Sequence, residues 1–205
     1  MPSPTEAVDA AELPPVAGGV EAAAALKLPT GIRKRIADFD ATVESKFDLL
    51  RGHPIADRIF YTASEVGDFA LIWHMIAAGR GLRSDRDAND ALRVAAILGA
   101  ETILVNGVIK SFFRRTRPDW EQHRAFRIRR PRSSSFPSGH ASSAFTAAGV
   151  LSQDDPLWPL FYTVAAVVAA SRVYVKIHHP SDVVAGIATG VVLARVARRI
   201  WPKAE

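Results

Sequence analysis

Residues 157–200 read LWPLFYTVAAVVAASRVYVKIHHPSDVVAGIATGVVLARVARRI, two long apolar runs joined by a short polar connection. Each run approaches the roughly 20 residues that an α-helix needs to cross the hydrocarbon core of a bilayer. The runs cover residues 157–175 and 181–200, and the connection between them holds a lysine and two histidines. This stretch predicts two membrane-spanning helices with a polar turn at one end.

Three earlier segments have similar character: residues 59–79, 91–112 and 138–152. The first is marginal because it contains Glu65 and Asp68, and the third is short and rich in alanine and serine. A soluble helical bundle is the alternative, and the hydropathy of the segments disfavours it. The sequence therefore predicts an all-α fold, a transmembrane helical bundle of about five or six helices with an amphipathic helix at its N-terminal side.

The N-terminal part of the chain differs from the rest. Residues 1–30 are rich in Ala, Pro, Gly and acidic residues, which predicts a disordered tail without a secretory signal. In residues 31–58, apolar positions recur every three or four residues, as in an amphipathic surface helix followed by a linker. Such a helix packs either on the rest of the protein or on the membrane surface. Residues 59–205 form the predicted membrane-embedded domain.

Composition narrows the choice of ligand without deciding it. The 205 residues fit one domain, and the net charge of +5 suits nucleic acid, anionic lipid or a phosphorylated substrate. Cysteine is absent, which excludes disulfides and thiolate metal sites. Nucleic acid is the least favoured partner, because the Arg-rich loop of residues 113–137 has few aromatic residues and matches no binding module.

Three clusters of polar residues follow or precede the predicted spans. A phosphoryl group in transfer spreads negative charge over its oxygens and needs fixed positive groups and N–H donors around it. Arginine binds two phosphate oxygens at once, and the start of a helix offers unpaired backbone N–H groups. The clusters are Lys110 with Arg117-Pro118, Pro137-Ser138-Gly139-His140, and Ser171-Arg172 with His178 and Asp182.

His178 and Asp182 are four residues apart, which places them on one face of a helical turn. A carboxylate that accepts a hydrogen bond from one imidazole nitrogen leaves the other nitrogen unprotonated, as a nucleophile requires. His179 is an alternative nucleophile by position. Neither zinc-type nor two-metal ligand spacings are present, so no metal or organic cofactor is expected.

Together the three clusters match the tripartite signature of the type 2 phosphatidic acid phosphatase superfamily, which the chain resembles over about residues 90–200. The resemblance implies that His178 attacks phosphorus and that Asp182 orients it. His140 would protonate the leaving oxygen and then activate water. The same resemblance selects His178 over His179, where many relatives carry an aromatic residue. It also implies phosphate binding by Lys110, Arg117, Ser138, Gly139 and Arg172.

The function implied by the resemblance is hydrolysis of a lipid phosphomonoester or diphosphate by a membrane phosphatase. Candidate substrates are phosphatidic acid, phosphatidylglycerophosphate, a polyprenyl diphosphate and a decaprenyl phosphoribose phosphate. One alternative is a vanadate-dependent haloperoxidase, since those enzymes resemble the superfamily in the same pocket. Another is a non-catalytic membrane protein that binds anionic lipid.

Hydropathy and motifs agree on topology, because four spans in alternation bring all three clusters to one membrane face. That face would carry 18 of the 26 Lys and Arg residues. The excess of positive charge on cytoplasmic loops favours an active site in the cytoplasm, in a bacterial cell membrane. Further expectations concern interfacial anchors, close helix packing and polar groups inside a span. Trp158 and Trp201 lie at span ends, as interfacial anchors would. Gly186 and Gly190 would allow close helix packing. Glu101 and Asn106 are the polar groups inside a span.

Overall fold

The computed structural model describes residues 29–118, 125–126, 128 and 133–203, and the predicted tail of residues 1–30 lies almost wholly outside them. Within this part of the chain every regular element is helical, which confirms the all-α prediction. An N-terminal helix precedes a bundle of six. The α-helices are α2 (Thr30–Asp48), α3 (Pro54–Val66), α4 (Leu71–Gly81), α5 (Asp85–Thr102), α6 (Gly139–Leu151), α7 (Trp158–Tyr174) and α8 (Pro180–Ile200).

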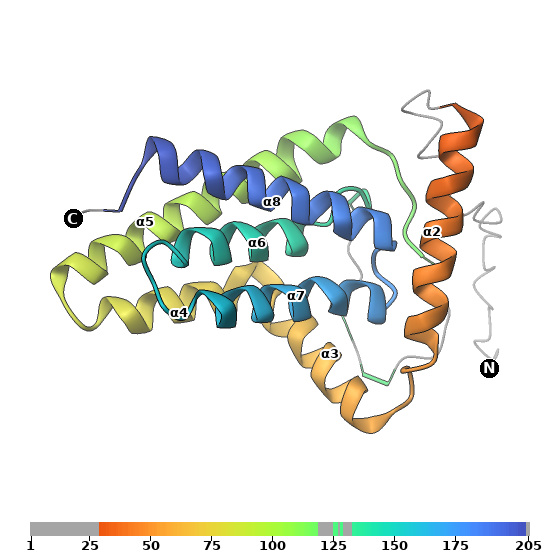
Figure 1. The fold of residues 1–205 in the computed structure, drawn as a ribbon, viewed down its shortest axis with the longest axis horizontal. Coiled ribbons are helices and arrows are strands. Elements are labelled where there is room, and N and C mark those ends of the chain that lie inside the picture. Colours follow the sequence, from red (N-terminus) through yellow and green to blue (C-terminus); the bar gives the residue numbers. More distant parts are fainter. Residues whose placement is uncertain (1–28, 119–124, 127, 129–132, 204–205) are drawn as a thin grey trace, which may run out of the picture.

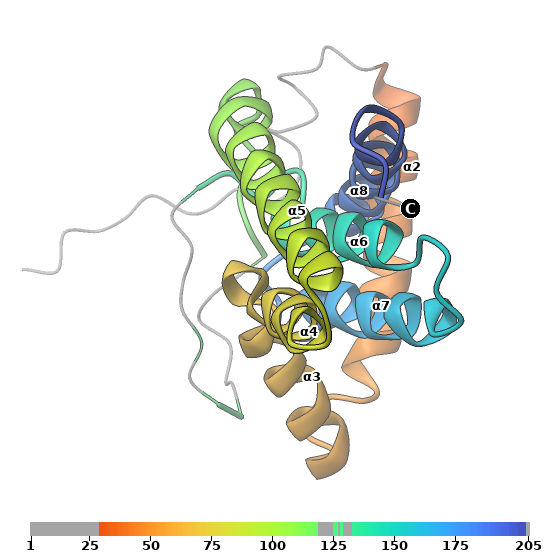
Figure 2. The ribbon, with the colours of Figure 1, turned by 90° about the vertical axis from the view of Figure 1, so that its left-hand side faces the viewer.

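Helices α4 to α8 run roughly along the long axis of the molecule, whereas α2 crosses their ends on one side (Figure 1). Viewed along the bundle, α6 lies between α5, α7 and α8 (Figure 2). This central position explains why α6 is made of Gly, Ala, Ser and Thr with few large side chains, since nearly all of its residues are buried. Small residues allow neighbouring helices to approach closely in a membrane.

Two glycines of α8 allow it to touch α6, as the sequence predicted. A Cβ atom at Gly186 would collide with the carbonyl oxygen of Ser138, and one at Gly190 would collide with that of Ser142. The prediction of close packing at these two positions is confirmed. The contact also fixes the start of α6, where Ser138 lies, against the first turns of α8.

The predicted span of residues 91–112 is part of a longer continuous helix, Asp85–Phe112, in which α5 passes into a π-helical turn at Ile103–Val108 and a 3₁₀ turn at Ile109–Phe112. Among the described residues, this is the one helix both long and apolar enough to cross a membrane by itself. Only 28% of its most apolar window is buried inside the protein. The other predicted spans are shorter, as in α6 and α7, or carry charges near their ends, as in α8.

The prediction of a single span over residues 59–79 is wrong. The chain breaks between α3 and α4 at Phe69 and Ala70, both of which have a φ of 55°. This backbone region is unfavourable for residues with a side chain, so a hydropathy pattern gives no sign of the turn. The two helices diverge in Figure 1. Asp68 lies at the break and reaches a residue of α6, as described below.

The predicted domain boundary between residues 58 and 59 falls inside α3, which begins at Pro54. Residues 49–53 form the exposed turn that connects α2 to α3, and residues 54–58 already belong to α3. The hydroxyl of Tyr174 on α7 donates a hydrogen bond of 2.6 Å to Asp57. The first turn of α3 is therefore held by α7, and the packed unit extends on both sides of residue 58.

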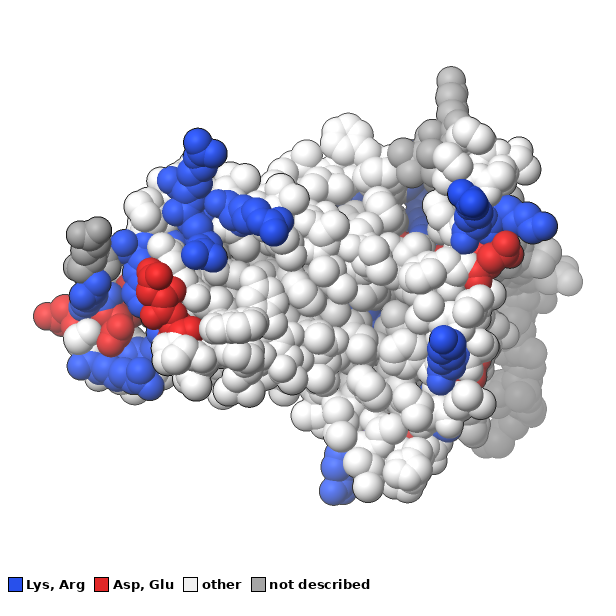
Figure 3. All heavy atoms as spheres, in the orientation of Figure 1, with Lys and Arg blue, Asp and Glu red and all other residues white. Residues whose placement is uncertain are grey.

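A band without Lys, Arg, Asp or Glu separates two charged ends on the face shown in Figure 3. Trp158 and Trp201 are both half-exposed and lie at the ends of α7 and α8 that point away from α2. Trp side chains at such ends are typical of the boundary between lipid and water. That these two residues are interfacial anchors stays a prediction.

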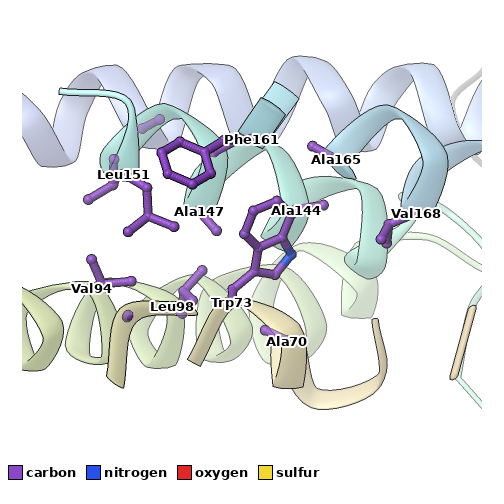
Figure 4. Close-up of a cluster of buried hydrophobic side chains, with 14 of the residues drawn as sticks. Ala70, Trp73, Val94, Leu98, Ala144, Ala147, Leu151, Phe161, Ala165 and Val168 are labelled. Carbon is purple, nitrogen blue, oxygen red and sulfur yellow. The ribbon is translucent and has the colours of Figure 1, made fainter. Parts of the chain in front are cut away.

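The core between α4, α5, α6 and α7 is built around Trp73, which is fully buried (Figure 4). Leu98 of α5, Phe161 of α7 and alanines of α6 surround it. A Trp among alanines fills the space that small residues leave, which keeps the packing dense. This core holds together the helices that carry the polar clusters at the end of the bundle next to α2.

Candidate active site

The structure brings the three polar clusters together at the end of the bundle that α2 crosses. The backbone N–H of Ser138 donates to the carbonyl of Asp182 at 3.0 Å, which joins the second cluster to the third. The Nη1 atom of Arg117 donates to the carbonyl of Ile177 at 3.0 Å and lies 3.2 Å from Nε2 of His178, which joins the first to the third. Residues more than 60 positions apart thus line one site.

Three cationic side chains surround this site, and all are largely withdrawn from solvent. Lys110 is 8% exposed and Arg172 is 2% exposed. Arg117 is oriented by the carbonyl oxygens of Ser133 and Ser134, each 3.2 Å from its guanidinium. Burial lowers the pKa of Arg117 to about 10, against the opposing effect of Asp182, so this side chain is still cationic near neutral pH. Buried cations without solvent are strong attractants for a phosphate group.

These cations are held by different means. Arg172 donates from Nη1 to the carbonyl and the hydroxyl oxygen of Ser64, while its buried Nε has no hydrogen-bond partner among the described residues. Lys110 forms no ion pair or side-chain hydrogen bond within the described part of the chain. Donors that protein groups do not use are available to a ligand, because a buried donor left unpaired is unfavourable.

The start of α6 supplies backbone donors to the same site. Ser138 is the N-cap, and its hydroxyl accepts a hydrogen bond from the N–H of Ala141 at 3.4 Å. A Cβ at Gly139 would lie 2.7 Å from the side-chain oxygen of Asn106, so any other residue there would displace the Asn106 side chain. The first N–H groups of a helix are unpaired and attract anions. The hydroxyl of Ser138 therefore caps the start of α6 at this site.

His178 lies in the connection between α7 and α8 and is 2% exposed. Its backbone N–H donates to the carbonyl of Arg172 at 3.1 Å. Burial lowers the pKa of His178 to about 3, although the carboxylate of Asp182 acts in the opposite direction. The imidazole is thus neutral at pH 7, as a nucleophile must be.

His178 and Asp182 lie side by side, but their side chains do not form the expected hydrogen bond. Nδ1 of His178 lies 3.7 Å from Oδ2 of Asp182, too far for a hydrogen bond, and has no other partner among the described residues. The carboxylate instead accepts from Nη1 of Arg115 at 2.7 Å, from the N–H of His179 at 2.9 Å and from the hydroxyl of Ser135. Asp182 is therefore fixed firmly beside His178.

Arg115 and Asp40 are two site residues that the sequence did not reveal. Nη2 of Arg115 donates to Oδ2 of Asp40 at 2.6 Å, and the N–H and hydroxyl of Ser181 donate to the same carboxylate at 2.7 and 2.8 Å. Asp40 is the buried residue of α2, and Phe47 of the same helix packs against Tyr174. No sequence spacing distinguishes Asp40 from Asp38, or Arg115 from Arg114.

A third residue not identified from sequence is Asp68, at the break between α3 and α4. Its Oδ1 lies 2.6 Å from Nε2 of His140, the residue expected to act as acid and base. A carboxylate close to one ring nitrogen fixes the orientation and tautomer of an imidazole. A carboxylate inside an apolar segment was the available signal, because such residues in membrane helices usually face a partner or a cavity.

The two polar residues expected inside a span have different environments. Glu101 is buried, and its Oε1 has no hydrogen-bond partner among the described residues, whereas Asn106 is exposed and faces Gly139.

In the described part of the chain, no three His, Asp or Glu residues are grouped so that they could hold a metal ion.

Comparison with known proteins places these observations in a family. The family model for the PAP2 superfamily matches residues 90–205. The decaprenylphosphoryl-5-phosphoribose phosphatase of Mycobacterium tuberculosis is 29% identical over 136 residues, which cover 65% of this chain and 73% of that protein. Phosphatidylglycerophosphatase B of Bacillus subtilis is 25% identical over 162 residues, covering 73% and 77%, respectively.

Two solved structures have a similar fold. The transmembrane PAP2-type phosphatidylglycerolphosphate phosphatase of Bacillus subtilis superposes with a TM-score of 0.66 at 24% identity, covering 90% of this chain and 92% of that one. LpxE of Aquifex aeolicus gives a TM-score of 0.61 at 24% identity, with coverage of 76% and 93%. Both comparisons agree with the helical architecture described above.

The helical fold and its polar site define an integral membrane phosphatase whose class cleaves lipid phosphates without a metal ion. The chain belongs to the PAP2 superfamily. The resemblance inferred from the three clusters is therefore confirmed at the level of the family.

Proposed function

We propose that this phosphatase removes the terminal phosphate of a lipid phosphomonoester or diphosphate through a phosphohistidine intermediate on His178. The observation that carries the proposal is a buried, neutral imidazole with Nε2 beside the guanidinium of Arg117. The names of relatives support phosphoribosyl, glycerophosphate and polyprenyl diphosphate lipids as candidate substrates. The polyprenyl diphosphate comes from a putative undecaprenyl-diphosphatase of Escherichia coli, which is 32% identical over 108 residues.

In the proposed first step, the lone pair of Nε2 of His178 forms an N–P bond while the P–O bond to the lipid breaks. The lipid oxygen takes a proton from His140. Arg117, Arg172, Lys110 and the N–H groups at the start of α6 stabilise the charge that develops on the phosphoryl oxygens. Fixed donors in a dry site do this well because they need no reorganisation during the reaction.

In the second step, water attacks phosphorus and gives a proton to His140. The N–P bond breaks, its electrons return to Nε2 of His178, and inorganic phosphate leaves. One side chain thus acts first as acid and then as base. Asp68 keeps His140 oriented in both steps, since its carboxylate lies 2.6 Å from the imidazole.

The purified protein in detergent should release phosphate from such lipids in the presence of a metal chelator. His178→Ala should abolish the release. The wild-type chain should carry acid-labile phosphate during turnover, and the His178→Ala chain should carry none. His179→Ala is the matched control, because its side chain is adjacent and takes no part in the proposed chemistry. Robust turnover by His178→Ala would refute the mechanism.

We also propose the organisation of the chain in the membrane. Residues 1–30 form a tail, residues 31–58 contribute α2 and the start of α3, and the catalytic residues face the cytoplasm of a bacterial cell. The excess of Lys and Arg on the catalytic side supports this orientation. Because the chain lacks cysteine, Lys46→Cys and Arg83→Cys place single thiols on opposite sides. A membrane-impermeant maleimide added to intact cells should label the Arg83→Cys protein and leave the Lys46→Cys protein unlabelled.

A further inference from the structure

A cavity of about 400 Å³ adjoins the catalytic site on the side of α3. One face of α3 lines it with Arg58, Tyr61, Thr62 and Glu65, positions that repeat at the spacing of a helix. Arg172, which belongs to the phosphate site, and Asp68, which contacts His140, also line it. The cavity therefore joins one cation of the phosphate site to a face of α3, a helix that carries no signature residue.

Three polar side chains that line this cavity make no polar contact with the part of the chain that the structure describes. Arg58, Thr62 and Glu65 are exposed and form no hydrogen bond or ion pair through their side chains within the described residues. Other polar residues of α3 contrast with them, because Asp57 is bonded to Tyr174 and Ser64 to Arg172. The cavity face of α3 thus offers a cation, a hydroxyl and a carboxylate to a ligand.

The order of these groups along α3 restricts the chemistry of that ligand. Next to the phosphate site lie the carboxylates of Asp68 and Glu65, which would repel a second phosphate directly bonded to the first and instead accept hydrogen bonds from hydroxyl groups. Arg58 lies two turns further on, about 10 Å from Glu65 along the helix. A guanidinium there suits a second anionic group at a distance from the first.

We propose that this cavity binds the headgroup of the substrate, and that the substrate is a phosphorylated sugar or polyol joined to its lipid by a phosphodiester. The terminal phosphate lies beside Arg172, the hydroxyls of the spacer bond to Glu65 and Thr62, and the phosphodiester pairs with Arg58. Phosphatidic acid and polyprenyl diphosphates lack the spacer and leave these groups unused. The inference rests on the proposed function, because it assumes that the terminal phosphate is the one cleaved.

Binding to the His178→Ala protein tests the inference without turnover. Phosphatidylglycerophosphate and phosphatidic acid with identical acyl chains are titrated in mixed micelles, and the ratio of their dissociation constants is measured. The ratio should favour phosphatidylglycerophosphate by about tenfold or more, as expected for an added charge-assisted hydrogen bond. Arg58→Gln and Glu65→Gln in the same background should each reduce this preference severalfold.

Arg83→Gln is the matched control, since it removes the same charge from an exposed position at the other end of the bundle, and it should leave the ratio unchanged. Equal affinity for the two lipids, or equal losses for both in Arg58→Gln, would overturn the headgroup site. If the preference is found but the wild-type protein releases no phosphate from either lipid, the proposed function fails and the binding site stands.

Discussion

The part of the chain that matches the family, residues 90–205, and the part that precedes it, residues 30–81, contribute to the site in different ways. The first holds the cations, the helix start and both histidines. The second contributes Asp40, Ser64 and Asp68, which bind Arg115, Arg172 and His140. The signature thus supplies the proposed chemistry, and helices without a signature hold its side chains in place.

Apart from the loss of His178 itself, the largest effect is expected from the signature side, where Arg172→Gln removes a buried cation. The kcat/KM for phosphate release should fall by about a thousandfold, because a donor that stabilises developing charge in a dry site is worth that much. Steady-state assays in detergent give this ratio. Arg195→Gln, an exposed arginine of α8 at the other end, is the control and should retain wild-type kinetics.

The preceding segment should give a smaller but clear loss in Asp68→Asn. The asparagine keeps the size of the side chain and removes the charge that lies beside His140. Loss of a group that orients a catalytic residue costs about 10- to 100-fold, so kcat should fall within that range while KM changes little. Asp85→Asn serves as the control. An unchanged kcat would show that the two halves are not coupled through this contact.

A weaker effect is expected further from phosphorus, at Asp40. Asp40→Asn should lower kcat by about tenfold, because Arg115 loses one carboxylate and holds Asp182 less firmly. Combining it with Arg115→Ala should add little to the loss from Arg115→Ala alone, since both changes interrupt one chain of contacts. Fully additive losses in the double-mutant cycle would argue against this chain.

The last prediction is that the imidazole of His178 does not titrate near neutral pH. Since burial holds the pKa of His178 near 3, protonation of this ring requires a pH far below its ordinary value of 6.5. In protein labelled with ¹³C at histidine Cε1, the His178 signal, assigned by its loss in His178→Gln, should not shift between pH 8 and pH 5. A midpoint near 6.5 would mean that the imidazole is open to solvent in the free enzyme.

The sequence predicted the family-matched part of the chain better than the part that precedes it. Apolar runs and fixed spacings identified the helices of the bundle and the residues that meet at its end, because a membrane segment and a phosphate site each demand particular side chains. The break at Phe69 and Ala70 had no such signal, since it depends on a backbone conformation that the surrounding packing imposes. Hydropathy therefore joined α3 and α4 into one span.

The positioning residues were hidden for another reason. Arg115 is buried between Asp40 and Asp182, whereas its neighbour Arg114 is exposed, yet both are arginines of one basic loop. Their roles depend on which side chain faces α2 once the helices are assembled. Contacts between residues 75 positions apart, as between Asp40 and Arg115, are set by tertiary structure and leave no local pattern.

The ion pair between α2 and the loop also bears on how such enzymes diversify. A chimera that takes residues 1–81 from a relative and keeps the remainder would retain every signature residue and still lack one of the two carboxylates that pair with Arg115, unless the donor carries a carboxylate at the position of Asp40. Modules of this family would then be exchangeable only in pairs, with the N-terminal helix and the arginine loop inherited together.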